Sequence, residues 1–173
     1  MDLALLILRV VVGVLFVGHG AQKLFGAFGG NGLEGTGGMF EHLGLKPGKV
    51  HAFNAGAAEF FGGALLALGL LTPIAAVLLI GTMTVAIATV HAAKGPWVTN
   101  GGYEYNAVLI AVAATLAGVG PGEWSLDNAF GIDWAGTAWV IGVLAVGIVG
   151  GLVTMAIGRL VGSHADSGHP AGA

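Results

Sequence analysis

The sequence has no cysteine and very little charge. Without cysteine, thiol exchange, disulfide relays, iron–sulfur ligation and cysteine-based zinc sites are excluded, so any redox chemistry has to come from a cofactor or a partner. Only 9% of the 173 residues are charged, and the formal net charge is −3. Because the few basic residues are scattered, they form no basic face, which excludes nucleic-acid binding.

Apolar residues are what the chain has in abundance. The hydrophobic set makes up 55% of the sequence and the mean hydropathy is +0.88. A water-soluble domain of this length needs far more charge to cover its surface, so the composition indicates an integral membrane protein within the lipid bilayer. A soluble helical protein with a very apolar core is the alternative. Asp2 stands where a signal peptide would be basic, so we expect the first segment to stay as a span.

The apolar segments predict an all-α protein with several membrane spans. Hydropathy places spans at residues 3–25, 53–71, 73–91 and 103–119, a further helix at 134–161, and a disordered polar tail at 162–173. Thr72 is expected to cap the third span, with Pro73 at its first helical position, so that spans two and three form a hairpin. The Gly-rich loop after span one is either a flexible linker or holds a short interfacial helix near residues 36–45.

Glycine and the loop charges suggest how the helices pack and how they are oriented. Gly147 and Gly151 form a GxxxG motif with Gly158 seven residues on, which we interpret as a contact with the bundle rather than as a homodimer face. The cations gather in loops one and three and at the C-terminus, whereas acidic residues gather on the other side. The sequence therefore predicts the N-terminus outside and the C-terminus in the cytoplasm. The cations are Lys46, Lys49, Lys94 and Arg159, and the acidic residues are Glu123, Asp127 and Asp133.

Polar residues gather at one end of four predicted spans. Because the spans alternate in direction, these ends lie on the same side of the membrane. His19 and Lys23 share one helix face, and Glu59 lies about 9 Å into its span. A carboxylate at that depth needs a cationic partner or a proton, so Glu59 is the most informative residue of the chain. The candidate polar pocket consists of His19, Lys23, Glu59, His91, Glu104 and Asn106.

Structural interpretations stand beside this functional one. The two histidines could simply form interfacial hydrogen bonds, and Lys23 could extend to the lipid headgroups. Glu59 could form a purely structural ion pair with Lys23 or His19. Arg9 lies within about 80° of the His19–Lys23 face, so it is a candidate for a structural ion pair inside the bundle.

Two imidazoles from different spans, His19 and His91, raise the question of a haem. Both lie near span ends in a small Gly-lined bundle without a second histidine pair, so a bis-histidine haem is disfavoured. A metal held by these two residues and Glu59 is disfavoured as well. The sequence assigns no metal and leaves the cofactor open.

Several stretches together resemble the DoxX family of small bacterial membrane proteins. They are "RVVVGVLFVGHGAQKLFG" at 9–26, "AAEFFGGALLALGLLTP" at 57–73, "MTVAIATVHAAKG" at 83–95, "GGYEYNAVLI" at 101–110 and "GPGEWSLD" at 120–127. The resemblance implies a four-helix transmembrane bundle over residues 1–130, so the helix at 134–161 is an addition to it. It also implies membrane redox chemistry, because the family includes a subunit of thiosulfate:quinone oxidoreductase.

Three functions remain open at this point. The resemblance and the candidate pocket favour a quinone-linked redox component of the inner membrane that works with a soluble or membrane-bound redox partner. A non-catalytic scaffold that recruits a soluble oxidoreductase is the alternative, with Lys46 and Lys49 as its docking surface. A proton-coupled transporter is less favoured because the spans show no inverted repeat. A homo-oligomer fits any of the three.

Overall fold

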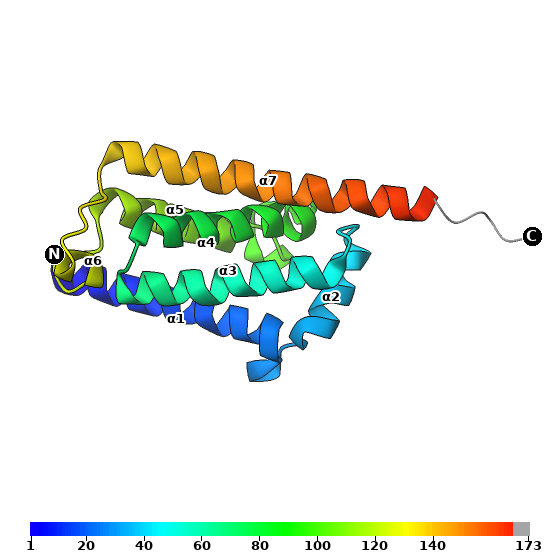
Figure 1. Cartoon of the computed structure of the whole chain (residues 1–173), viewed down its shortest axis with the longest axis horizontal. Coiled ribbons are helices and arrows are strands. Elements are labelled where there is room, and N and C mark those ends of the chain that lie inside the picture. Colours follow the sequence, from blue (N-terminus) through cyan, green and yellow to red (C-terminus); the bar gives the residue numbers. More distant parts are fainter. Residues whose placement is uncertain (168–173) are drawn as a thin grey trace, which may run out of the picture.

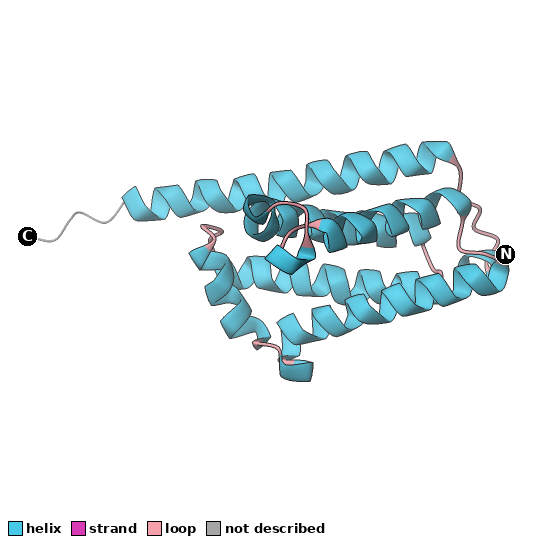
Figure 2. Cartoon of the chain, turned by 180° about the vertical axis from the view of Figure 1, so that it is seen from behind, coloured by secondary structure: helices cyan, strands magenta, loops and turns pink. Residues whose placement is uncertain are grey.

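The computed structural model describes residues 1–167 and consists of helices joined by short loops (Figure 1). Figure 2 shows that the described part of the chain contains no strand. The long helices are α1 (Asp2–Phe25), α3 (Gly48–Leu68), α4 (Thr72–Ala86), α5 (Glu104–Val119) and α7 (Thr137–Ser167). The short helices are η1 (Ala27–Gly29), α2 (Gly32–His42), η2 (Ile87–His91), η3 (Ala92–Lys94), η4 (Val98–Asn100) and α6 (Leu126–Ala129).

Length and apolar composition confirm a helical membrane protein. Among residues 1–167, three segments are long and apolar enough to cross a bilayer: Asp2–Phe25, Thr72–Lys94 and Thr137–His164. Helix α5 is apolar but shorter. Helix α3 has 21 residues and carries polar side chains, and it packs between α1 and α4 in the same bundle.

The closest helix pair is α1 with α3, which run side by side in opposite directions (Figure 1). Glycine makes this approach possible, since a Cβ atom added at Gly63 would lie 2.6 Å from the carbonyl oxygen of Gly13. Phe16 fills the interface and is fully buried. Small residues that let helix backbones touch are a common basis of helix packing in membranes.

Helix α7 packs along α4, and the GxxxG motif forms the contact. A Cβ atom at Gly147 would lie 2.7 Å from the Ile80 side chain, and one at Gly151 would lie 2.7 Å from the Gly81 carbonyl oxygen. The prediction of a bundle contact is therefore confirmed for both glycines. Gly158 also faces the bundle, where it contacts His51 of α3.

The start of α4 differs from the prediction. Leu71, with φ 48°, is the N-cap, and Thr72 is already helical, so the prediction of a Thr72 cap is wrong. The carboxylate of Asp127 caps the helix instead. It accepts from the Leu71 N–H at 2.7 Å and from the Thr72 N–H and hydroxyl at 3.0 and 2.7 Å. Asp127 is therefore buried rather than a free loop charge, which removes one acidic residue from the orientation argument.

Arg9 is buried at the same end of the bundle as Asp127, away from Lys23. Its guanidinium donates to the carbonyl oxygens of Trp124 and Leu68, the latter at 3.3 Å. Within residues 1–167, no carboxylate lies within ion-pair distance of Arg9, so the predicted ion pair is wrong. The two terminal nitrogens of the guanidinium make these bonds, whereas Nε is buried without a hydrogen-bond partner among the described residues. Through these bonds Arg9 ties the "GPGEWSLD" turn to the end of α3.

The helix bounds shift at two of the predicted spans. The second begins at Gly48, five residues earlier than expected, and the last continues to Ser167, so residues 162–167 belong to α7 rather than to a disordered tail. The rest of that predicted tail, 168–173, lies outside the described residues. The loop after span one does hold a short helix, α2, rather than a plain linker. The predicted orientation in the membrane stays a prediction.

Candidate functional site

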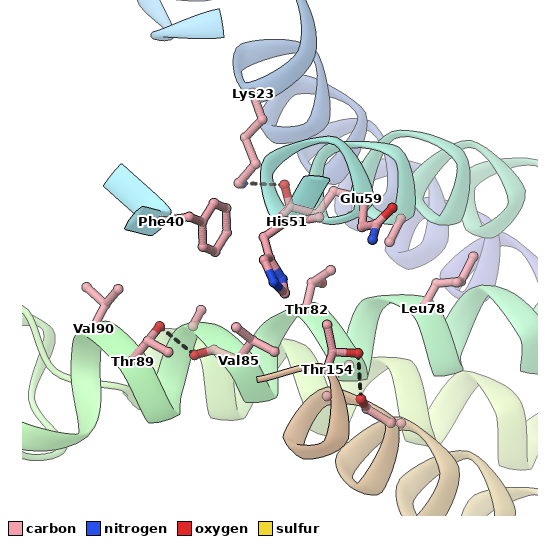
Figure 3. A pocket seen from close by; sticks show the side chains of 18 of the residues that line it. Lys23, Phe40, His51, Glu59, Leu78, Thr82, Val85, Thr89, Val90 and Thr154 are labelled. Carbon is pink, nitrogen blue, oxygen red and sulfur yellow. Dashed lines mark hydrogen bonds and ion pairs between the residues drawn. The ribbon is translucent and has the colours of Figure 1, made fainter. Parts of the chain in front are cut away.

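A cavity of about 400 Å³ lies between α2, α3, α4 and α7 (Figure 3). Helices α3 and α7 both pack on α4 and meet each other at His51 and Gly158, and the cavity opens between them. Asn54 on one side of this opening and Gly150 on the other are exposed. The volume lies within the range of small-molecule sites in proteins.

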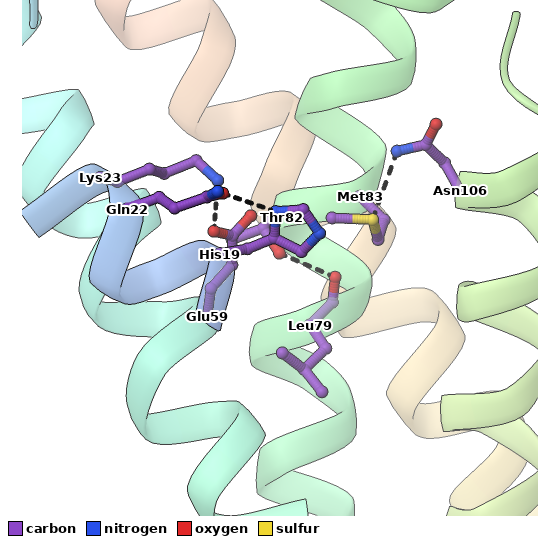
Figure 4. A network of polar contacts seen from close by, with 8 residues as sticks. All are labelled: His19, Gln22, Lys23, Glu59, Leu79, Thr82, Met83 and Asn106. Atoms are coloured by element: carbon purple, nitrogen blue, oxygen red, sulfur yellow. Dashed lines mark hydrogen bonds and ion pairs between the residues drawn. The ribbon is translucent and has the colours of Figure 1, made fainter. Parts of the chain in front are cut away.

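Lys23 and Glu59 form an ion pair at the wall of the cavity (Figure 4). Lys23 is in the last turn of α1 and Glu59 is in the middle of α3, where Gly56 allows the Lys23 stem to lie close to the α3 backbone. The Glu59 side chain is only 4% exposed, whereas that of Lys23 is 24% exposed. The predicted cationic partner of the buried carboxylate is thus Lys23.

His51 lines the same cavity two helical turns before Glu59 (Figure 3). It is 9% exposed, and its ring packs at 6.3 Å, centroid to centroid, against that of Phe40 in α2. On its other side it contacts Gly158 of α7. Neither ring nitrogen has a hydrogen-bond partner among the described residues.

Three threonines add oxygen atoms to the cavity wall, and their hydroxyl protons are already used. Thr82 donates to the Leu79 carbonyl at 2.9 Å, and Thr89 and Thr154 donate to carbonyls of their own helices at 2.7 and 2.8 Å. These hydroxyls therefore offer the cavity acceptor lone pairs. The deeper wall is apolar and includes Val77.

His19 lies beside this pair but does not line the cavity. The residue is exposed, and its Nδ1–H donates to the side-chain oxygen of Gln22 at 3.2 Å. Gln22 in turn donates to the carbonyl of Phe28 at 3.4 Å. Figure 4 shows His19 next to Lys23 and Glu59. The "VGHGAQKLFG" stretch therefore supplies one side chain to the cavity, Lys23, while His19 and Gln22 organise the turn that follows.

The remaining predicted pocket residues lie elsewhere, so the expectation of one six-residue pocket is wrong. His91 donates from Nδ1–H to the Gly101 carbonyl at 2.7 Å, and Glu104 accepts from the Val98 N–H at 2.9 Å, so both hold the loop before α5. Asn106 is buried and donates to the Met83 sulfur at 3.3 Å. The helix ends that carry these three residues lie at the same end of the bundle as Lys23, as predicted. Their side chains, however, bond to nearby backbone or, for Asn106, lie in the contact between α4 and α5. Within residues 1–167, no group of three or more His, Cys, Asp or Glu residues is arranged to hold a metal.

His51 is the cavity residue that the sequence analysis missed. Hydropathy predicts that the second span begins at residue 53, which places this histidine in the preceding loop. The spacing of His51, Ala55 and Glu59 at successive fourth positions was the signal that could have found it, because residues so spaced share one helix face.

Fold and site together define a helical membrane bundle with a cavity that is open at its side, polar at one end and apolar at the other. The family model of DoxX matches residues 4–92, from α1 to the first residue of η3. The chain is 34% identical over 117 residues to the Bacillus subtilis (strain 168) protein named "Putative oxidoreductase CatD", a match that covers 68% of this chain and 81% of the relative. No solved structure matches. The chain belongs to the DoxX family.

Proposed function

We propose that this protein is a quinone-binding component of a redox system in the cell membrane and that the cavity between α3, α4 and α7 is its quinone site. The observation that carries the proposal is the Lys23–Glu59 pair at the wall of a cavity whose lining is otherwise largely apolar. A charged pair deep in a membrane bundle marks a functional site by default. Family membership and a relative named as an oxidoreductase support a redox role.

The shape and polarity of the cavity suit an amphiphile from the bilayer. The opening lies between α3 and α7, whose outer faces carry exposed apolar residues such as Phe53 and Val149. A quinone has an apolar tail and a ring with two carbonyl oxygens, and a site for it combines apolar walls with a few polar groups. Glu59, Lys23 and His51 are groups that can exchange protons with a reduced quinone.

The chain has no cysteine and so no thiol or iron–sulfur chemistry of its own, which leaves a bound cofactor or a redox partner as the source of electrons. The proposal includes a redox partner protein. We expect this partner to dock at the end of the bundle where α2 and the polar end of the cavity lie. In the orientation predicted from the loop cations, that end faces the cytoplasm.

The test is quinone binding by detergent-purified protein, with decylubiquinone as the probe. Gly150→Leu adds a side chain at the exposed edge of the cavity lining, where a Cβ atom at residue 150 meets nothing within 4 Å. We expect this variant to lose most of the binding because the plug occupies the ligand volume. Gly142→Leu is the matched control, since it makes the same change on the same helix at a position that also has free space and lies outside the cavity.

Equal binding by the two glycine variants would show that the cavity is not the quinone site. Glu59→Gln, which keeps the size of the side chain and removes its charge, is expected to weaken binding or to slow quinone-dependent oxidation of a donor. If wild-type protein binds no quinone while crosslinking in membranes recovers a stable oxidoreductase complex, a non-catalytic scaffold is the better description.

A further inference from the structure

His51 is a buried polar side chain without a hydrogen-bond partner, and it lines the cavity. A neutral imidazole has one N–H donor and one acceptor nitrogen. The His51 ring nitrogens are not among the fully buried unpartnered atoms of the described residues, so part of their surface stays accessible in a side chain that lines the cavity. Among the described residues nothing bonds to the His51 ring, which has packing contacts only. A group that enters the cavity can therefore gain a hydrogen bond that the protein itself leaves open.

The ring is held in place from two sides. Phe40 of α2 packs against it with an angle of 40° between the ring planes. On the α7 side, a Cβ atom at Gly158 would lie 2.5 Å from Nε2 of His51, so a side chain there would displace the ring from its present position. Because packing already fixes the side chain, little conformational entropy is lost when a ligand bonds to it.

The other buried polar side chain in the cavity wall is already engaged. Glu59 is paired with Lys23. The hydroxyl protons of Thr82, Thr89 and Thr154 are bonded to carbonyls of their own helices, so these residues offer acceptors only. A quinone carbonyl oxygen is an acceptor and needs a donor. The ring N–H of His51 is the buried lining donor that remains open in the described part of the chain.

The position of His51 also orients a ligand. It lies about 12 Å along α3 from Glu59, toward the end of the helix that meets α2, and the opposite end of the cavity is lined by Val77, Leu78 and Val146. A ligand whose polar head reaches His51 can lay its apolar tail along those residues. In the reverse orientation the head would lie among apolar side chains and have no hydrogen-bond partner.

We propose that His51 donates a hydrogen bond to one carbonyl oxygen of the quinone and so fixes its head at the α2 end of the cavity. This inference rests on the proposed quinone function. It adds the residue that binds the quinone head, His51, and the orientation of the quinone in the cavity. The acceptor is a carbonyl-type oxygen on an amphiphile, and the apolar tail points toward the middle of the bundle.

The experiment measures the decylubiquinone dissociation constant and the infrared carbonyl band of the bound quinone. In wild-type protein one carbonyl band should move to lower frequency because hydrogen bonding weakens the C=O bond. His51→Leu should raise the dissociation constant about tenfold, as expected for one lost hydrogen bond, and should return the band to the free-quinone frequency. His51→Gln, which keeps a donor, should restore part of both effects. His42→Leu, at an exposed histidine of α2 outside the cavity, is the matched control and should change neither.

The outcomes separate this inference from the proposed function. If wild-type protein binds no quinone, both are overturned. If quinone binds and Gly150→Leu blocks it, but His51→Leu leaves the dissociation constant and the band unchanged, the quinone site stands and the role of His51 is overturned. Should His51→Leu fail to fold, the wild-type spectrum still decides, because a bound quinone with both carbonyl bands at the free frequency has no hydrogen bond from His51.

Discussion

Replacing Lys23 should destabilise the protein more than replacing its partner Glu59. The reason is the unequal exposure of the two side chains, 24% for Lys23 and 4% for Glu59. Lys23→Met leaves the Glu59 carboxylate buried without a cation. Glu59→Gln leaves an ammonium near the end of α1, where its long stem can turn toward the headgroups, and the glutamine oxygen still accepts a hydrogen bond.

The magnitude follows from the burial of Glu59. Removing one partner of a buried ion pair costs about 3–5 kcal/mol. An upper limit of about 3.7 kcal/mol applies here, since an unpaired glutamate can take up a proton and protonating an ordinary glutamate at pH 7 costs that much. We therefore expect about 3 kcal/mol for Lys23→Met. For Glu59→Gln we expect about 1–2 kcal/mol, because the charge attraction is lost while the glutamine oxygen still accepts a hydrogen bond.

The assay is reversible unfolding in mixed micelles, followed by circular dichroism, for wild type, both single variants and the double variant. The double variant removes both charges, so it should be more stable than Lys23→Met alone. Its free energy of unfolding should depart from the sum of the single changes by about 1–3 kcal/mol, as for groups in direct contact. Two results would refute the reasoning: additive effects, or a larger loss for Glu59→Gln than for Lys23→Met.

Two further predictions concern the fold around the site. Asp127→Ala removes the acceptor of three hydrogen bonds at Leu71 and Thr72, so the melting temperature should fall, with a loss of about 2–4 kcal/mol in unfolding free energy; an unchanged melting temperature would contradict the cap. Gly63→Val forces a side chain into the backbone of α1 at Gly13 and should abolish the folded monodisperse species in size-exclusion chromatography, whereas Gly18→Val, at an α1 position with free space, should not.

The sequence predicts the helices well because hydropathy and helix length are local properties. The span at residues 3–25 and the GxxxG contact of Gly147 and Gly151 agree with the structure for this reason. What fails depends on distant groups. The cap of α4 comes from Asp127, 55 residues after Thr72, and Arg9 donates to a carbonyl at residue 124. No periodicity within a span carries information about such partners.

The candidate site shows the same division. The depth of Glu59 within its span predicts that this carboxylate needs a cation, and the shared helix face of His19 and Lys23 supplies two candidates. The ion pair is therefore predictable from the sequence. Topology, however, places helix ends on one side without fixing the rotation of each helix. His91 and Glu104 sit at the expected end, yet both turn to the loop before α5.

The helix outside the family match completes the cavity. Lys23, Glu59, His51 and two threonines of the wall belong to residues 4–92, which the DoxX model matches, so the shared part of the chain supplies most of the polar chemistry. The opposite wall is α7, where Gly147, Gly150 and Gly151 keep the cavity wide, and Gly158 seats the His51 ring. Side-chain volume on α7 therefore decides which ligands fit, while residues 4–92 supply most of the polar groups that can bond to a ligand or exchange protons with it. Enlarging Gly150 should change binding without altering the Lys23–Glu59 pair, because the two features come from different helices.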